Sequence, residues 1–267
     1  MANAEHSGDL RLARHIIDRL ISELNVILSD DLVGIYLYGS LVSGDFDIAV
    51  SDIDLVVALA RDLNARQFQS LQAMHARVVG DHPDWDDRLE LAYISRRALK
   101  TFRDVESTIG IISPGEPFHL IQAGEDWLIS WYDLRRNGIA LQGPPIQTLI
   151  DPIPARDWLE AVRAHICAYH RSVTDAADIM YLSYIVLTVA RGVYTLAHGQ
   201  AASKVKAAAW ARRRFPRWSG LIARSLQWRS GATEDSPPIA QLRAEVKHYL
   251  DDILPEASCR GEEALTD

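Results

Sequence analysis

The chain has 267 residues, 48% of them hydrophobic and 24% charged, which is the composition of an ordinary soluble globular protein. Two cysteines are too few for a disulfide framework or a cysteine metal cluster, and the polar N-terminus and short apolar runs exclude a signal peptide and a membrane span, so we expect reduced thiols in a cytoplasmic protein. The formal net charge is −8, and residues 1–150 hold 13 Lys and Arg against 22 Asp and Glu. Many of these charges can be ordinary solvated surface residues. The acidic balance also disfavours nucleic acid and favours cationic small molecules as partners.

The first half of the chain alternates between helical and extended patterns. Apolar residues recur at helical spacing over residues 10–28, and the short apolar run 33–38 has the pattern of a strand that stops at Gly39-Ser40. The patterns that follow predict a buried strand, a helix and a third strand of alternating polarity, at residues 53–59, 63–79 and 88–94.

The second half is predominantly helical. A stretch beyond residue 95, containing Pro114-Gly115, is interpreted as loop-rich, and a helix is expected through Trp127 and Trp131. Dense turn chemistry at 143–154 marks a domain boundary, so we expect one α+β domain at 1–150 and an all-helical domain at 151–267. Helical periodicity in the second domain covers residues 156–172, 178–198, 203–214, 218–229 and 238–252.

Two aspartates at the start of the second strand are candidate metal ligands. Asp52 and Asp54 are separated by one residue, so the period-two rule places both carboxylates on the same face, where they can hold one hard cation. Like charges this close repel unless a cation lies between them, which indicates a magnesium site. The alternative is a solvent-facing pair, which the strongly apolar strand and the preceding turn make the weaker reading.

A phosphate grip and a third carboxylate complete the pattern. Gly39 permits close backbone approach and Ser40 supplies a hydroxyl directly after a strand, a suitable arrangement for binding phosphate. Glu90 lies on the third predicted strand between two leucines, so it shares the face of the aspartates if those leucines are core; the alternative is a surface residue on an edge strand. The sequence lacks a P-loop, a dinucleotide-binding glycine motif and a G-x-S-x-G elbow.

These segments resemble the polymerase-beta-like nucleotidyltransferase superfamily, and more closely the aminoglycoside adenylyltransferases that modify streptomycin and spectinomycin. The likeness rests first on Tyr38-Gly39-Ser40, Ser51-Asp52-Ile53-Asp54 and Leu89-Glu90. It extends over most of the chain, through residues 139–144, 151–154, 187–199, 203–204, 209–211 and Pro216. It implies a catalytic domain with a mixed sheet and flanking helices, a helical domain that binds substrate and nucleotide, and an active site in the cleft between them.

The resemblance also implies roles for individual residues. Asp52 and Asp54 would hold Mg²⁺, Glu90 would be the catalytic base and contact the substrate, and the co-substrate would be ATP. The implied nucleotide contacts are Gly39, Ser40, Ser51, Asp126 and Lys204. Where the family carries an aromatic nucleotide contact, commonly tyrosine, the nearest match is Trp228, which offers no hydroxyl.

The substrate-binding segment departs most from the family. Streptomycin-modifying relatives carry tryptophan and acidic residues before the helix at Leu187, whereas this chain offers Asp175 and Asp178, with Trp127 or Trp131 as hypothetical further contacts. The stretch 95–122 has no close counterpart in the family. The expected reaction is magnesium-assisted adenylylation of an aminoglycoside or aminocyclitol hydroxyl; the alternatives are transfer to a metabolite or protein hydroxyl, or a non-catalytic nucleotide-binding relative.

Overall fold

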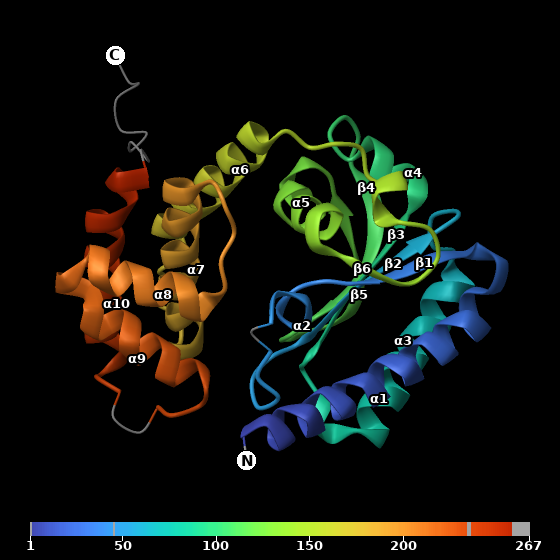
Figure 1. Ribbon diagram of the computed structural model, residues 1–267, viewed down its shortest axis with the longest axis horizontal. Helices are drawn as coiled ribbons and strands as arrows, with labels where there is room; N and C mark the ends of the chain where they lie inside the picture. Colours follow the sequence, from blue (N-terminus) through green and yellow to red (C-terminus); the bar gives the residue numbers. More distant parts are fainter. Residues whose placement is uncertain (1, 45, 234–235, 258–267) are drawn as a thin grey trace. The chain divides into compact units, whose positions relative to one another are not determined.

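The computed structural model describes residues 2–44, 46–233 and 236–257, which form two compact units, Met1–Ile153 and Pro154–Asp267 (Figure 1). The first unit contains a mixed sheet with helices on its faces, and the second contains helices, so the prediction of an α+β protein with a helical second part is confirmed.

Six strands form one sheet in the order β5-β4-β3-β2-β1-β6. Only β2 and β3 pair in parallel; the other neighbours are antiparallel. The strands are β1 (Leu32–Leu37), β2 (Ile53–Leu59), β3 (Leu89–Ser95), β4 (Ser107–Ser113), β5 (Glu116–Ala123) and β6 (Ile139–Gln142). The helices of this unit are α1 (Ala2–Leu28), α2 (Ser40–Ser43), α3 (Ala65–Asp81), α4 (Arg96–Thr101) and α5 (Leu128–Asn137).

The alternation of side chains along the strands assigns the two faces of the sheet. Odd-numbered residues of β2 and β3, such as Leu55 and Leu91, join the apolar stripes of α1 and α3 in one buried core. Figure 1 shows these two helices side by side on one face of the sheet and α5 on the other. Even-numbered residues, including Asp54 and Glu90, therefore lie on the face opposite α1 and α3.

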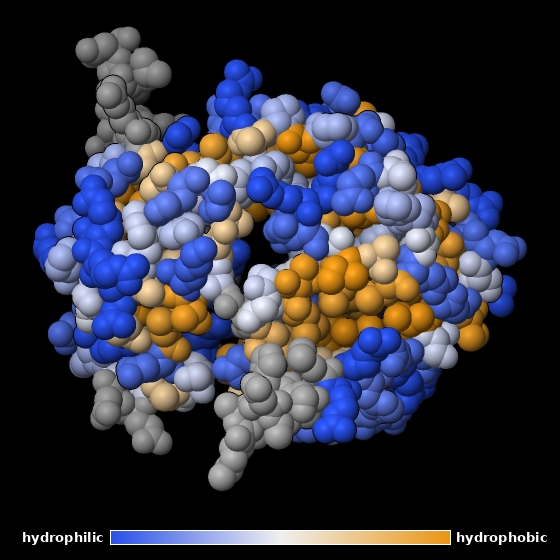
Figure 2. Space-filling view, in the orientation of Figure 1, coloured by the Kyte–Doolittle hydropathy of each residue, from blue (hydrophilic) through white to orange (hydrophobic). Residues whose placement is uncertain are grey.

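One sequence expectation in this unit is wrong. The stretch beyond residue 95 is not loop-rich, because it forms α4 and the antiparallel hairpin of β4 and β5. Ser113 pairs with Glu116 across Pro114-Gly115, and Gly115 has a φ of 80°, which suits the third position of a tight turn. Strand β6, which forms one edge of the sheet, was also not predicted. Figure 2 shows a group of hydrophobic side chains beside α1. It lies where Figure 1 draws this edge of the sheet and α2.

The second unit packs its helices around α7. Its helices are α6 (Ala155–Ala168), α7 (Ile179–His198), α8 (Lys204–Arg214), α9 (Ser219–Arg229) and α10 (Ile239–Ile253), close to the five predicted ranges. Among the described residues, α7 alone is long and apolar enough to cross a membrane; 61% of its apolar window is buried, which is typical of a core helix. Cys259 lies outside the described residues, so the expectation of reduced thiols stays a prediction.

Candidate active site

The parallel pairing of β2 and β3 places two carboxylates next to each other. Asp54 and Glu90 are direct register partners, and both are partly exposed between buried neighbours on the same strand. Asp52 lies one residue before β2, in phase with Asp54. The strand pattern thus brings the predicted acidic residues to one end of two adjacent strands, on the face that α1 and α3 leave uncovered.

The turn after β1 lies against this pair. Gly39 has a φ of 68°, and a Cβ built on it would stand 1.9 Å from Oδ2 of Asp54, so only glycine fits beside the carboxylate. Ser40 begins α2, and its hydroxyl is buried with no hydrogen-bond partner. A buried hydroxyl without a partner is costly, which indicates that a polar ligand satisfies it during function.

Tyr38 connects the turn to the carboxylates. Its side chain is 9% exposed, and its hydroxyl donates a hydrogen bond to Oε1 of Glu90 at 3.3 Å. Burial raises the pKa of the Tyr38 phenol well above its ordinary value, and the negative charges of Glu90, Asp54 and Asp133 raise this pKa further. The phenol therefore stays protonated and remains a hydrogen-bond donor among acidic groups.

A short loop before β2 is held by Arg88 from the start of β3. One guanidinium nitrogen of Arg88 donates to the carbonyls of Ile48 and Ser51, each at 2.6 Å. Within the loop the Ser51 hydroxyl, which is buried, accepts from the amide of Asp47 at 3.0 Å. Ser51 thus organises the loop that precedes Asp52, and its contact with a nucleotide stays a prediction.

The residues that could hold a divalent cation are Asp52 and Asp54. Among the described residues, no three His, Cys, Asp or Glu side chains are close enough to hold one metal ion together. A cation at this position would therefore take its remaining ligands from outside these side chains. Carboxylate oxygens are the donors that magnesium prefers, and the negative potential that raises the pKa of Tyr38 also favours a cation.

Asp126 and the predicted aromatic contacts lie at and before α5. Asp126 is exposed in the turn before α5, where its carboxylate accepts from the amide of Gly124 at 2.7 Å. Trp131 is 1% exposed, so it is unavailable to a ligand, whereas Trp127, stacked on it at 5.2 Å, is partly exposed. Asp133, which sequence reasoning missed, lies further along α5 and accepts a hydrogen bond from Asn137 at 2.7 Å.

In the helical unit, Lys204 lies at the first position of α8, with its ammonium 5.9 Å from the ring centre of Tyr184. Tyr184 stacks on Tyr181, and both rings are more than 40% exposed. Exposed aromatic rings beside a lysine can accept a planar or cationic ligand. The sequence offered a signal for this group, since the two tyrosines are three residues apart on a helix.

The structure corrects the prediction for Trp228. This residue is 3% exposed and belongs to the core of the helical unit, with the guanidinium of Arg224 5.5 Å from its ring centre. Stacking on a nucleotide base requires a free ring face, and the burial of Trp228 leaves none.

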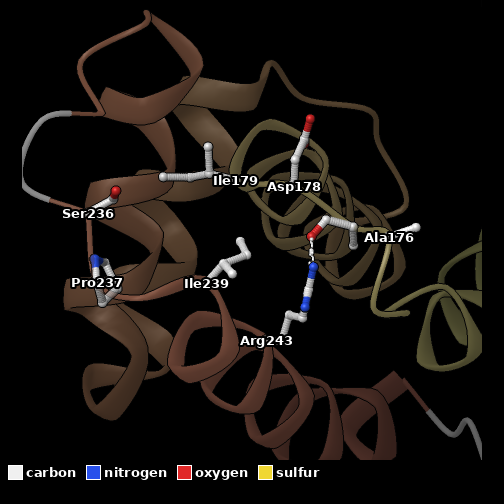
Figure 3. A pocket seen from close by; sticks show the side chains of 8 residues that line it. Ala176, Asp178, Ile179, Ser236, Pro237, Ile239 and Arg243 are labelled. Carbon is white, nitrogen blue, oxygen red and sulfur yellow. Dashed lines mark hydrogen bonds between the residues drawn. The ribbon is translucent and has the colours of Figure 1, made fainter.

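Asp175 and Asp178 lie just before α7, and both have structural partners. The Asp178 carboxylate accepts from the amide of Tyr181 at 2.8 Å and so caps the helix. Arg243 approaches the Asp175 carboxylate to 3.9 Å and donates to the carbonyl of Ala177. Figure 3 shows Arg243 and Asp178 among the residues that line a pocket of about 360 Å³. Both carboxylates are exposed, and their contact with a cationic substrate stays a prediction.

Comparison with known proteins adds independent information. Residues 148–256 match the family model "Aminoglycoside adenylyltransferase, C-terminal domain", and residues 17–110 match the model "Nucleotidyltransferase domain". The chain is 27% identical over 243 residues to an aminoglycoside (3'') (9) adenylyltransferase of Klebsiella pneumoniae, covering 84% of this chain and 87% of that protein. It is 28% identical over 244 residues to the protein of the same name from Escherichia coli, covering 84% and 88%.

A solved structure shares the fold. The crystal structure of a spectinomycin adenyltransferase from Enterococcus faecialis, with ATP and spectinomycin, superposes with a TM-score of 0.71 at 18% identity. The match covers 91% of this chain and 99% of that one. Both units of the chain therefore have counterparts in a single known protein.

Proposed function

We propose that the chain is a member of the aminoglycoside adenylyltransferase family of the polymerase-beta-like nucleotidyltransferases, and that it transfers AMP from ATP to a hydroxyl group of an aminoglycoside or aminocyclitol antibiotic. The observation that supports the proposal most directly is the pairing of Asp54 with Glu90 beside the Gly39-Ser40 turn. The acids lie beside a turn whose second residue, Ser40, has a buried hydroxyl without a hydrogen-bond partner, and this hydroxyl could bind a phosphate oxygen.

Magnesium fits the carboxylates that this chain provides. We assign Asp52 and Asp54 as its ligands, because both offer hard oxygen donors in an acidic environment. Asp52 precedes β2 and Asp54 is the second residue of this strand. When bound, the ion supplies charge neutralisation and orientation for the phosphates of ATP.

The chemical step uses Glu90 as the base. A substrate hydroxyl attacks the α-phosphorus of ATP in line, Glu90 accepts the proton of that hydroxyl, and the bond between the α-phosphorus and the pyrophosphate oxygen breaks. Gly39 and Ser40 offer backbone and hydroxyl donors to the phosphates. Ser51, Asp126 and Lys204 are further proposed nucleotide contacts.

The acidic face favours a polycationic acceptor. Asp54 and Glu90 of the sheet and Asp133 of α5 all raise the pKa of the Tyr38 phenol, so the surroundings of Tyr38 are acidic. Protonated amino groups of an aminoglycoside or aminocyclitol are attracted to such a surface, which raises both encounter rate and selectivity. Asp178 in the helical unit is a further proposed substrate contact. The reaction would occur in the cytoplasm, where ATP and magnesium are available.

The test is an assay of pyrophosphate release by the intact protein with ATP, magnesium and a panel of aminoglycosides and aminocyclitols. Parent, Glu90→Gln and Asp52→Asn proteins are compared, with Asp84→Asn as the matched control because Asp84 is an exposed acid outside the site. We expect at least one antibiotic to stimulate release by the parent, and the two site variants to lose about 100-fold or more in kcat. Release without stimulation by any antibiotic would assign the transfer to a metabolite or protein hydroxyl, and no turnover with any acceptor would reject the enzyme.

A further inference from the structure

The hydroxyl of Tyr38 lies where it can control the proposed base. Tyr38 follows β1 directly, and its amide donates to the carbonyl of Asp54 at 3.2 Å. Its backbone is thus fixed to β2, while its hydroxyl reaches Oε1 of Glu90 on β3 at 3.3 Å. One residue therefore spans the two strands that carry the acidic pair.

The carboxylate of Glu90 needs such a contact to stay in one orientation, because the glutamate side chain has three rotatable bonds. Glu90 of β3, Asp54 of β2 and Asp133 of α5 all raise the pKa of the Tyr38 phenol, so the surroundings of its hydroxyl include three acidic groups. Carboxylates repel each other, so the neighbouring acids favour rotamers that turn Glu90 away. The hydrogen bond that the Tyr38 hydroxyl donates holds Oε1 of Glu90 in place against this repulsion.

We propose that Tyr38 is a positioning residue that holds the Glu90 carboxylate in the orientation in which it accepts the proton of the substrate hydroxyl. The inference rests on the proposed function, in which Glu90 is the base. The distance of 3.3 Å is longer than the usual 2.7–2.8 Å for such a bond, and we expect it to shorten when substrate binds, as catalytic hydrogen bonds do.

Tyr36 provides a matched control. It is on the same strand two residues earlier, it is buried, and its hydroxyl donates to the carbonyl of Pro144 at 2.9 Å instead of to a site carboxylate. Tyr36→Phe and Tyr38→Phe therefore each remove one hydrogen-bonded tyrosine hydroxyl from the same strand. Only the second removes a contact of the proposed base.

The experiment measures kcat and the KM for ATP of the full-length parent, Tyr38→Phe, Tyr36→Phe, Glu90→Gln and the Tyr38→Phe/Glu90→Gln double variant, with thermal unfolding of each. We expect Tyr38→Phe to lower kcat about tenfold with the KM for ATP unchanged. Tyr36→Phe should keep the parental kcat. In the Glu90→Gln background, Tyr38→Phe should cause no further loss, because the base it positions is already gone.

Each other outcome overturns the inference. A parental kcat for Tyr38→Phe, or a full additional tenfold loss in the Glu90→Gln background, would show that the hydroxyl does not act through Glu90. If Tyr38→Phe does not fold, Tyr38→His, which keeps a ring and a hydrogen-bond donor, is compared with Tyr38→Leu. Equal kcat values for these two variants would contradict the proposal. Failure of the proposed function is distinguishable, because the parent itself would then transfer no AMP.

Discussion

At the scale of single residues, we expect the site to tolerate substitution of Gly39 least. Its φ of 68° strains any other residue, and a Cβ there would collide with the carboxylate of Asp54. We predict that Gly39→Ala displaces Asp54 and lowers kcat/KM for AMP transfer about 100-fold, since ångström-scale displacements of catalytic groups have effects of this size.

Gly44→Ala is the control for the strain alone. Gly44 has a φ of 78°, and a Cβ built on it meets nothing within 4 Å. Its substitution should therefore cost about 1 kcal/mol of stability or somewhat more, with kcat/KM within a few-fold of the parent. Steady-state kinetics and denaturant unfolding of both variants separate the two effects; equal losses of activity would remove Asp54 from the explanation.

His75 predicts how the stability of the first unit depends on pH. The imidazole is 2% exposed, one ring nitrogen lies 2.8 Å from the Tyr93 hydroxyl, and burial lowers the pKa of His75 from 6.5 to about 4. The folded state disfavours the protonated ring, so this contribution to stability is complete above pH 6.5 and is lost as the pH falls toward 4. The loss should reach about 2 kcal/mol by pH 5.

His75→Gln isolates this contribution, because glutamine keeps a polar partner for Tyr93 but does not titrate between these pH values. The free energy of unfolding of both proteins is measured from pH 8 to pH 5 by urea titration. The difference between parent and variant should change only below about pH 6.5. Two parallel curves would mean that His75 does not titrate on unfolding in this range.

At the scale of elements, the sequence predicted the segments whose apolar pattern matches one period. Strand β2 has the predicted bounds, and the helices of the second unit lie within a few residues of their predicted ranges. The hairpin of β4 and β5 was missed because Pro114-Gly115 is equally typical of a loop and of a tight turn. Pro117 lies in β5, which is an edge strand, where proline is tolerated.

At Asp178, the stability of a helix and the binding of substrate can be tested separately. Its carboxylate caps α7, and it is also a proposed contact for a cationic substrate. Asp178→Ala should lower the free energy of unfolding by about 1 kcal/mol, while Asp178→Asn should keep the cap and the stability. Removal of the charge should raise the KM for the antibiotic about fivefold in both variants, as expected for an exposed charge pair.

Urea unfolding and steady-state kinetics with the best acceptor check both halves of this prediction. Asp151→Asn, an exposed acid of the first unit, serves as the charge control. An unchanged KM for Asp178→Asn would leave Asp178 with its capping role alone. Unchanged stability of Asp178→Ala would instead show that the cap contributes little to α7.

At the scale of the whole molecule, the placement of the proposed site residues was predictable where it follows from one strand pattern and a turn. The pairing of Asp54 with Glu90 and the fit of Gly39 agree with that pattern. The burial of Trp228 could not be predicted from the sequence, because α9 is amphipathic and only its packing in the folded unit decides which face is buried. The contacts of Arg88 span 37 and 40 residues, and no local pattern predicts them.

Lys204 of the helical unit is a proposed contact of the ATP triphosphate, and amide hydrogen exchange tests this proposal. Its ammonium is a suitable point charge for a triphosphate, whereas the grip at Ser40 belongs to the first unit. We expect ATP with magnesium to slow amide hydrogen exchange both at residues 38–43 and at the start of α8. Lys204→Met should abolish the second protection, keep part of the first, and raise the KM for ATP about tenfold.

Lys206→Met is the matched control, because Lys206 lies on the same helix and is exposed, with its ammonium 5.7 Å from the ring centre of Tyr194. It should leave the exchange pattern and the KM for ATP as in the parent. Protection confined to the first unit in the parent protein would mean that ATP is bound without the helical unit. Equal effects of Lys204→Met and Lys206→Met would reduce the role of Lys204 to general electrostatic attraction, which added salt would suppress in both variants.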